Sequence, residues 1–455
     1  MTLGVPGIPL TVLVLAGVGS PALLLAVLGG ASLLGRPLPE RWTGPIAATA
    51  MTLACAALAA AFAVHGMAGT GTRLLSYGAW SSSHEGGIAF EFLVDGLSLA
   101  FAALSTAIAG VVSAFSNRYL HREAGYNRYF VLLGMFVTGM LLVALAGNVS
   151  VLFIGWELVG LSSALLVAFF QERPAAVSNA FRVAAVYRIS DAAMLSAAVL
   201  LRHVAGTDSL SLLFGGAAPV AGLTATNATM IAILLIVAVA GKSALLPFAG
   251  WLPRAMEGPT PSSAVYYGSL SIHAGCFLLL RAAPLLEQAP AARILAGGLG
   301  AATALFAGTT LRVQSDVKSS LAYASLTQVG LIVTEIALGW YTLAFVHLAG
   351  HACFRLLQFL SAPNVLHDLH GLADAIGDHG RPGGGHPGVV GSDRVRRRVF
   401  LIALERGFLD SMLDRAVVEP FTRLAALLTR FDRRLCDAVM PTRLPAGLDG
   451  GDRDE

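Results

Sequence analysis

Lysine is rare in this chain, and one lysine lies where a proton could be bound and released. Of the 30 basic residues, only Lys242 and Lys318 are lysines, and the others are arginine. Arginine keeps its proton in proteins, whereas a lysine that is removed from water can release it. Lys242 lies within the apolar run 231–248, so we interpret it as a candidate proton carrier. The alternative is a lysine near a helix end that extends to the lipid headgroups.

Three further charged residues fall within apolar segments. Glu157 lies in the run 151–170, and Arg188 and Asp191 lie three residues apart in the run 176–202. Ionisable groups at membrane depth are costly, so they are candidates for function, and each is expected to have a partner. Arg188 and Asp191 share one face of a helix and can pair with each other, which would also suit a purely structural ion pair.

A polar stripe follows near residue 350. His347, His351 and Arg355 recur at intervals of four residues, which places them on one helix face, with Gln358 nearby. Histidine titrates near neutral pH, and buried lysine or glutamate can do so, and water molecules between such groups can carry a proton. Neither carboxylates nor thiolates are in register with the stripe, so we expect no metal site there.

Membrane-spanning helices must position these residues. Only 13% of the 455 residues are charged and 56% are hydrophobic, which is too few polar residues to cover a water-facing surface. Apolar segments of about 20 residues recur, as membrane-spanning helices require. We expect an all-α polytopic membrane protein with about 11 transmembrane helices, one of them discontinuous, and a C-terminal amphipathic helix. The expected spans are 8–34, 46–68, 92–115, 129–147, 149–170, 176–202, 228–247, 260–281, 291–311, 319–338 and 341–363.

Prolines predict the discontinuous helix. Pro247 and Pro253 follow Lys242 closely, and Pro259 and Pro261 come soon after. Proline breaks a helix, and broken helices occur in membranes where they line a cavity or an ion site. We therefore expect a broken-helix loop beside Lys242.

Arginine is unevenly distributed between alternate connections. By the positive-inside rule, this distribution predicts a multi-pass protein of the cell (inner) membrane, with its N-terminus outside and its C-terminus in the cytoplasm. The connections richer in basic residues carry Arg36 and Arg41; Arg118, Arg122 and Arg128; Arg173; Arg254; and Arg312 with Lys318.

Four segments are expected along the chain. Residues 1–90 would hold the first transmembrane helices and an outer loop, and residues 91–366 the proton-conducting transmembrane domain. Residues 367–399 are rich in Gly, Pro, His, Asp and Arg, which indicates a flexible cytoplasmic loop. Residues 400–455 would form an amphipathic helix, lying on the membrane surface or against a partner, and a tail.

Several classes of function lack their signatures. The four cysteines show no metal or disulfide spacing, and no phosphate-binding glycine loop is present. We expect a transporter or channel subunit rather than an enzyme, with no catalytic residue, no metal and no cofactor in this chain, and no nucleic-acid partner.

At these residues the sequence resembles the antiporter-like proton-channel subunits of respiratory complex I and of Mrp-type cation antiporters. The resemblance covers about residues 90–370 and implies that Glu157 and Lys242 are paired proton-handling groups, in one pathway with Arg188, Asp191 and the stripe. It is carried by 155–163 (GWELVGLSS), 188–191 (RISD), 241–247 (GKSALLP), 251–261 (WLPRAMEGPTP) and 314–323 (QSDVKSSLAY), together with His347, His351 and Arg355.

The chain departs from that family at three places. Family members carry a histidine early in the eighth span, where this chain has Tyr267, and His273 follows six residues later, about 9 Å further along a helix. We include His273 in the expected pathway. Arg355 stands where lysine is usual. After the eleventh span, the second inverted repeat with its own broken helix is expected to be shortened.

This shortened plan resembles the membrane subunit of DAB-type inorganic-carbon transporters. The resemblance implies a pump for CO2 and bicarbonate, in which protons or another cation drive a large cytoplasmic zinc protein similar to β-carbonic anhydrase (a DabA-like subunit). Zinc is then expected in the partner. Two alternatives stay open. One is a proton-translocating subunit of a complex I-like NADH–quinone oxidoreductase or a hydrogenase, which would make the assembly a translocase, and the other is an Mrp-type cation/proton antiporter subunit.

Overall fold

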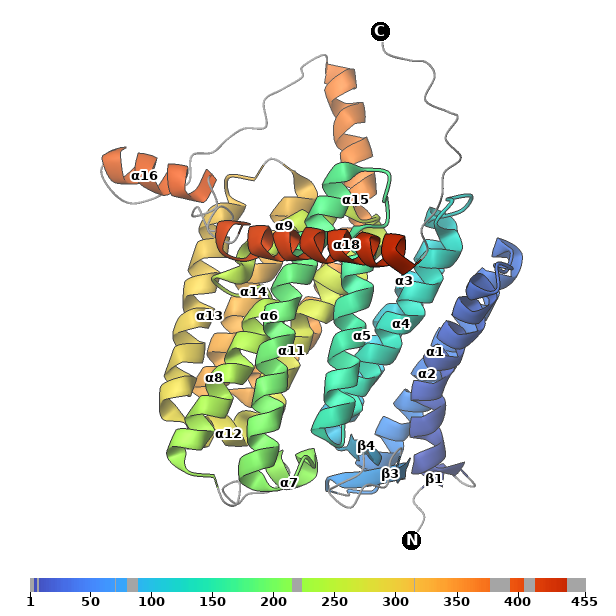
Figure 1. Cartoon of the computed structure of the whole chain (residues 1–455), viewed down its shortest axis with the longest axis vertical. Coiled ribbons are helices and arrows are strands. Elements are labelled where there is room, and N and C mark those ends of the chain that lie inside the picture. The colour runs from blue at the N-terminus through green and yellow to red at the C-terminus, as the bar shows by residue number, and fades with distance from the viewer. Residues whose placement is uncertain are drawn as a thin grey trace.

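Long apolar helices stand side by side in the computed structural model (Figure 1). The structure describes residues 4–5, 8–69, 71–79, 89–214, 223–314, 316–376, 393–404 and 414–439. Within these residues, 11 helices are long and apolar enough to cross a membrane. The polytopic α-helical fold predicted from the sequence is therefore confirmed.

The spans agree with the predicted ones to within a few residues at most ends. The eighth span joins three pieces: α10 (Thr260–Ser262), a π-helical stretch (Ser263–Leu270) and α11 (Ser271–Arg281). The others are α1 (Leu10–Leu33), α2 (Glu40–Met67), α3 (Gly96–Tyr119), α4 (Tyr126–Leu145), α5 (Val149–Val167), α6 (Pro174–Ala205), α8 (Ala225–Lys242), α13 (Pro290–Leu311), α14 (Val317–Leu338) and α15 (Tyr341–Ile376).

Two short hairpins at one end of the bundle were not predicted. Strands β1 (Gly4–Val5) and β2 (Ile8–Pro9) form one, and β3 (Arg73–Ala79) and β4 (Ala89–Val94) form the other. Consequently α3 begins at Gly96 rather than at residue 92, because Asp95 caps it by accepting a hydrogen bond from the Ser98 backbone. The short α-helices α7 (Leu210–Phe214), α9 (Trp251–Arg254) and α12 (Ala283–Gln288) lie between spans, with 3-10 turns at Phe248–Gly250 and Ala255–Glu257 on either side of α9.

Glycines let two pairs of spans approach closely. A Cβ at Gly139 of α4 would lie 2.9 Å from the Gly155 carbonyl of α5, and one at Gly300 of α13 would lie 2.7 Å from the Gly330 carbonyl of α14. Small residues at such crossings are how membrane helices gain van der Waals contact. The span Thr260–Arg281 lies at the centre, since its most apolar window is 100% buried.

The segment predicted as a flexible loop, 367–399, differs from the prediction at both ends. Helix α15 continues to Ile376, and α16 (Asp393–Leu404) begins before the expected loop ends, so the arginines from 394 to 398 lie in a helix. The glycine and proline that indicated a loop are concentrated in residues 377–392, which lie outside the described residues. Leu366, Leu369 and Leu372 before them recur at helical spacing.

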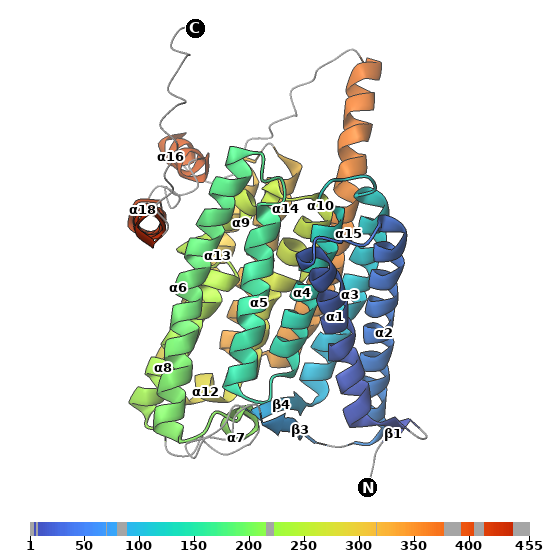
Figure 2. The same ribbon diagram turned by 45° about the vertical axis from the view of Figure 1, so that its right-hand side comes forward.

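The expected amphipathic helix is α18 (Glu419–Val439). It runs across the spans in Figure 1 and lies outside the bundle in Figure 2. A salt bridge attaches the turn that precedes it, because Arg182 of α6 donates from Nε to Asp414 at 2.8 Å. The predicted tail beyond residue 439 lies outside the described residues. Which end of the bundle faces the cytoplasm stays a prediction.

Candidate functional site

Helix α8 ends inside the bundle at Lys242. Ala244 has a positive φ of 55°, and Pro247 cannot continue an α-helix. Trp251 Nε1 donates to the Gly241 carbonyl at 2.9 Å, which satisfies one acceptor that the break leaves free. All four prolines of the expected broken-helix loop lie between the end of α8 and the start of α11: Pro247, Pro253, Pro259 and Pro261.

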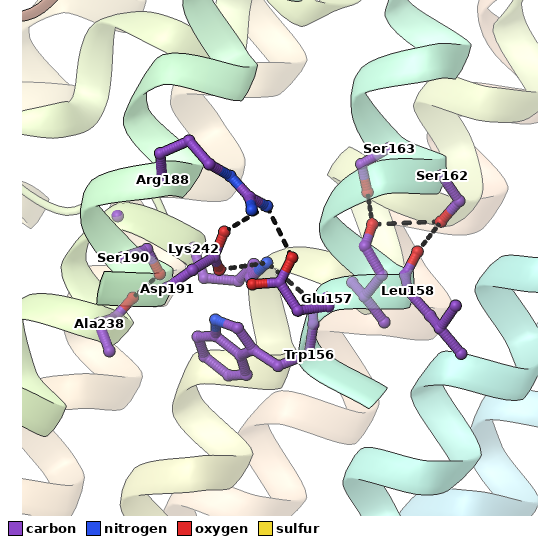
Figure 3. Close-up of polar contacts among 12 residues, drawn as sticks. Trp156, Glu157, Leu158, Ser162, Ser163, Arg188, Ser190, Asp191, Ala238 and Lys242 are labelled. Carbon is purple, nitrogen blue, oxygen red and sulfur yellow. Dashed lines mark hydrogen bonds and ion pairs between the residues drawn. The ribbon is translucent and has the colours of Figure 1, made fainter. Parts of the chain in front are cut away.

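The Lys242 side chain is fully buried, at 0% exposure. Its Nζ donates to the Trp156 carbonyl at 3.1 Å and lies 3.6 Å from Asp191 Oδ1 (Figure 3). The same atom lies 4.9 Å and 4.4 Å from the ring centroids of Trp156 and Tyr187. The carboxylate, the carbonyl and the two aromatic faces supply the compensation that a buried ammonium needs.

The other charges of the site form a chain with this pair. Arg188 Nη2 lies 2.6 Å from Asp191 Oδ2 and donates to Glu157 Oε2 at 2.8 Å. Glu157 is therefore connected to Lys242 through Arg188 and Asp191, and the carboxylate paired with Lys242 is that of Asp191. The resemblance implies that Glu157 and Lys242 act as a pair in proton transfer, which stays a prediction; the hydrogen-bonded connection between them is indirect. The physical reason is that α6 packs against both α5 and α8 and places its own charges between them.

The two halves of this chain of charges differ in exposure. Lys242 and Asp191 are 0% and 4% exposed, whereas Glu157 and Arg188 are 29% and 49% exposed. The network thus extends from the centre of the bundle to the outer face of α6.

Sequence reasoning missed the residues that shape this site. Gly160 of α5 faces the lysine, because a Cβ there would lie 2.8 Å from Lys242 Nζ. Trp156 and Tyr187 supply the aromatic faces. Trp156 directly precedes Glu157, and Tyr187 lies four residues, about one helical turn, before Asp191. This spacing places Tyr187 and Asp191 on one helix face and could have indicated Tyr187 as a site residue.

The polar stripe of α15 forms a second cluster with α11. His273 Nε2 lies 2.9 Å from His351 Nδ1, and Arg355 Nε donates to His351 Nε2 at 3.1 Å. His347 lies one turn earlier, with its ring centroid 6.5 Å from that of His351. The structure thus brings together all four residues predicted here.

Glu335 of α14 was missed. Its Oε1 lies 2.9 Å from His347 Nδ1, and Gln328 Oε1 lies 3.0 Å from His347 Nε2. Glu335 is the one acidic residue within the span Val317–Leu338, and that isolation was a usable signal. Helix register alone could not show the contact, because it crosses from one helix to another.

Buried hydroxyl groups adjoin the two clusters. The Tyr187 ring contacts Lys242 Nζ, and Ser271 lies two residues before His273 in α11. Neither hydroxyl has a hydrogen-bond partner among the described residues. Tyr267, which replaces the family's histidine, donates to the Ser163 carbonyl at 2.8 Å. Outside both clusters, Lys318 Nζ donates to the Gly258 carbonyl at 3.4 Å and so contacts the broken-helix loop.

A bundle of spanning helices with a buried lysine at a helix break defines a polytopic membrane protein with an internal ion-pair network. The chain belongs to the family described as NADH:quinone oxidoreductase/Mrp antiporter, TM, whose model matches residues 146–378, just over half of the chain. The model for the N-terminus of chain 5 of NADH-ubiquinone oxidoreductase (complex I) matches residues 80–130. The membrane subunit family predicted from the motifs is confirmed.

Curated relatives belong to the same family of membrane subunits. NADH-quinone oxidoreductase subunit L of Campylobacter jejuni subsp. jejuni serotype O:2 is 36% identical over 288 residues, covering 63% of this chain and 48% of the relative. NADH-ubiquinone oxidoreductase chain 5 of Metridium senile is 37% identical over 280 residues, covering 62% and 46%. The chain therefore spans about half the length of the curated relatives that it matches.

Two solved structures share the fold. A chain of the Mrp complex from Dietzia sp. DQ12-45-1b matches with a TM-score of 0.67 and 28% identity, covering 77% of this chain and 37% of that one. A chain of the membrane-bound sulfane sulfur reductase, an archaeal respiratory membrane complex, matches with a TM-score of 0.65 and 20% identity, covering 77% and 70%. The second likeness concerns the fold alone.

Proposed function

We propose that this chain conducts protons, or another cation, across the membrane as one subunit of a larger membrane complex. The observation that carries the proposal is the fully buried Lys242, paired with Asp191 at the break in α8. A lysine in such a site can exist with or without its proton, depending on whether its partners stay in place. The break in α8 also lets Lys242 move relative to those partners.

The arrangement suggests how the charge would move. Asp191 holds the protonated form of Lys242, and Arg188 binds the same carboxylate while it also binds Glu157. When Arg188 draws Asp191 away, the ammonium loses its counter-ion and releases its proton. Buried hydroxyls are where ordered water binds, so Tyr187 and Ser271 mark the path that we propose toward His273.

The complex itself is part of the proposal. The relatives are named as parts of NADH-quinone oxidoreductases, and one matching structure is of an Mrp complex. We infer that this chain works in a redox-driven complex of that kind or in a cation/proton antiporter. It would catalyse no reaction itself and hold no cofactor.

A second candidate is the membrane subunit of an inorganic-carbon pump. It is favoured by Tyr267 and Arg355, which stand where the proton-channel subunits carry a histidine and a lysine. In this case α16 and α18, with their many arginines, would bind a large soluble zinc protein at the cytoplasmic end. Zinc would belong to that partner.

Purification of the full chain from its native membrane in mild detergent tests both candidates. For the first, we expect membrane or redox subunits to co-purify, and liposomes holding the complex to accumulate protons when it is energised. Lys242→Ala should abolish accumulation without loss of assembly, with Arg202→Gln, at the far end of α6, as the control. A large zinc-containing soluble partner would select the second candidate. Full accumulation by the Lys242→Ala complex would contradict conduction through this site.

A further inference from the structure

The His273–His351 pair is a row of hydrogen bonds in which every donor can be assigned. His273 Nδ1 lies 2.6 Å from the backbone carbonyl of Ser269. A carbonyl oxygen only accepts. The proton of His273 is therefore on Nδ1, which leaves Nε2 as an acceptor.

The contact with Arg355 fixes the position of the proton on His351. Arg355 Nε carries a hydrogen and has no acceptor capacity, so it donates to His351 Nε2, at 3.1 Å. The proton of His351 is then on Nδ1 and is donated to His273 Nε2, at 2.9 Å. Each ring holds one proton and is neutral. All donors point in one direction, from Arg355 through His351 and His273 to the Ser269 carbonyl.

An additional proton has no site in this arrangement. A second proton on His351 would go to Nε2 and would face the N–H of Arg355. A second proton on His273 would go to Nε2 and would face the N–H of His351. Arg355 does not release its own proton, and the Ser269 carbonyl does not take one. The row is therefore closed at both ends while Arg355 stays in place.

We propose that Arg355 is a gate on the His273–His351 pair, which takes up a proton only after the guanidinium leaves His351 Nε2. The inference rests on the proposed cation conduction and names the element that would control it. Arg355 is 7% exposed and also donates to Gln358, one turn further along α15. Gln358 thus offers a place to which the guanidinium can retreat.

The route to the open pair comes from the same helix. His347 lies one turn before His351, and Glu335 of α14 contacts His347. The charged and titratable groups around the pair are thus Arg355 and His347 on α15 and Glu335 on α14. Once Arg355 has moved, His351 Nε2 is a free acceptor. A proton taken up there lets His351 pass its Nδ1 proton to His273 Nε2. The charged His273 ring then turns from the Ser269 carbonyl and gives its Nδ1 proton to the ordered water that we propose beside the Ser271 hydroxyl.

Arginine suits this role better than lysine. Its planar fork donates from Nε to His351 and from Nη1 to Gln358 at the same time. A lysine could bring its own proton to the pair and would join the path instead of closing it.

Nitrogen NMR on the full-length protein with 15N-labelled histidine tests the closed state directly. We expect His273 and His351 both to carry their proton on Nδ1, with signals assigned by His273→Gln and His351→Gln. In Arg355→Gln, the His351 Nε2 signal should change, because the Nε donor that binds it in the wild type is gone. A wild-type His351 that carries its proton on Nε2 would overturn the proposal without any variant.

Passive proton leak into liposomes tests the gate. Losing a hydrogen bond from a charged donor is worth roughly tenfold in an equilibrium, so Arg355→Leu should raise the leak by about that factor. The double variant Arg355→Leu/His351→Leu should leak at the wild-type level, because the histidine that accepts the proton is gone. The control Leu357→Ala, on the outer face of α15, should also leak at the wild-type level. An unchanged leak in Arg355→Leu, with unchanged histidine signals, would overturn the gate.

Failure of the proposed conduction through Lys242 and failure of the proposed gate give different results. Lys242→Ala lies outside this row and should leave the histidine tautomers unchanged. If Lys242→Ala transports normally while Arg355→Leu leaks, the proposed conduction through Lys242 fails and the gate stands. If Lys242→Ala is inactive while Arg355 variants neither leak nor change the tautomers, the gate fails alone.

Discussion

At the scale of single residues, the site balances its charges within one small region. Lys242 and Arg188 are positive, Asp191 and Glu157 are negative, and contacts connect all four. Breaking a buried pair by removing one partner costs much more than the pair itself contributes, because an uncompensated charge remains. This balance explains how a lysine persists at 0% exposure among apolar helices.

Asp191→Asn should remove the counter-ion of Lys242 and leave the side chain's shape nearly unchanged. The loss of a buried partner costs about 3–5 kcal/mol unless the lysine loses its proton, so translocation should fall steeply and the melting temperature should drop. Asp208→Asn, in the half-exposed pair with Arg202 at the end of α6, is the matched control and should change neither. Wild-type translocation by Asp191→Asn would show that this carboxylate is dispensable.

Gly160→Ala should place a methyl group against the ammonium of Lys242. The added Cβ would lie 2.8 Å from Nζ, so the lysine must move away from Asp191 or α5 must shift, at a cost of roughly 1–3 kcal/mol. Translocation and thermal stability should both fall. Gly110→Ala on α3, where the added Cβ meets nothing within 4 Å, should behave as wild type; equal behaviour of the two variants would contradict the tight fit.

At the scale of helices, the sequence was sufficient for the spans and insufficient for their contacts. A span needs about 20 apolar residues in a row, and that requirement is local. The pairing of Lys242 with Asp191, and of His347 with Glu335, depends on how each helix is rotated against its neighbours. The hairpin β3–β4 was not predicted because its strands are short and do not form a long apolar run. The extension of α15 was missed because the loop was inferred from the average composition of 367–399.

One contact between elements should be visible as an acid-dependent loss of stability. Asp95, before α3, pairs with Arg281 at the end of α11. Burial alone would raise the pKa of Asp95, but the hydrogen bonds and charge of Arg281, with the hydrogen bonds of Ser98, outweigh burial and lower it below 3.8. A lowered folded-state pKa adds stability above the unfolded-state pKa, and this stability is lost as the pH falls through the folded value.

Melting temperatures in detergent from neutral pH into the acid range measure this contribution. The wild type should lose stability relative to Asp95→Asn as the pH falls below the ordinary range of a carboxyl group, because the variant has no proton to take up there. At neutral pH the variant should be the less stable of the two. Parallel curves for the two proteins across the whole range would contradict the lowered pKa.

At the scale of the whole molecule, the ends of the described bundle are arranged as an odd number of spans requires. The strands β1 to β4 lie at one end, and α16 and the extension of α15 lie toward the other (Figure 2). The connections that are richer in arginine lie at this second end, which the positive-inside rule assigns to the cytoplasm. The sequence thus predicts that α16 and the extension of α15 face the cytoplasm.

Chemical labelling of Cys436 tests the orientation. This cysteine lies in α18 and is exposed. In a variant that keeps Cys436 as its only cysteine, a membrane-impermeant thiol reagent should label it in inverted vesicles and not in intact cells. Labelling in intact cells would place α18 outside and reverse the predicted topology.

The central claim is that Lys242 binds and releases the transported proton, and Lys242→Arg tests it most directly. Arginine keeps the positive charge beside Asp191 but does not release its proton. Energised proton uptake would be measured in liposomes that hold the complete complex, after its assembly and melting temperature have been matched to the wild type. The account predicts that Lys242→Arg assembles and takes up no protons. Uptake at the wild-type rate would show that Lys242 acts only through its charge, and the claim would then be wrong.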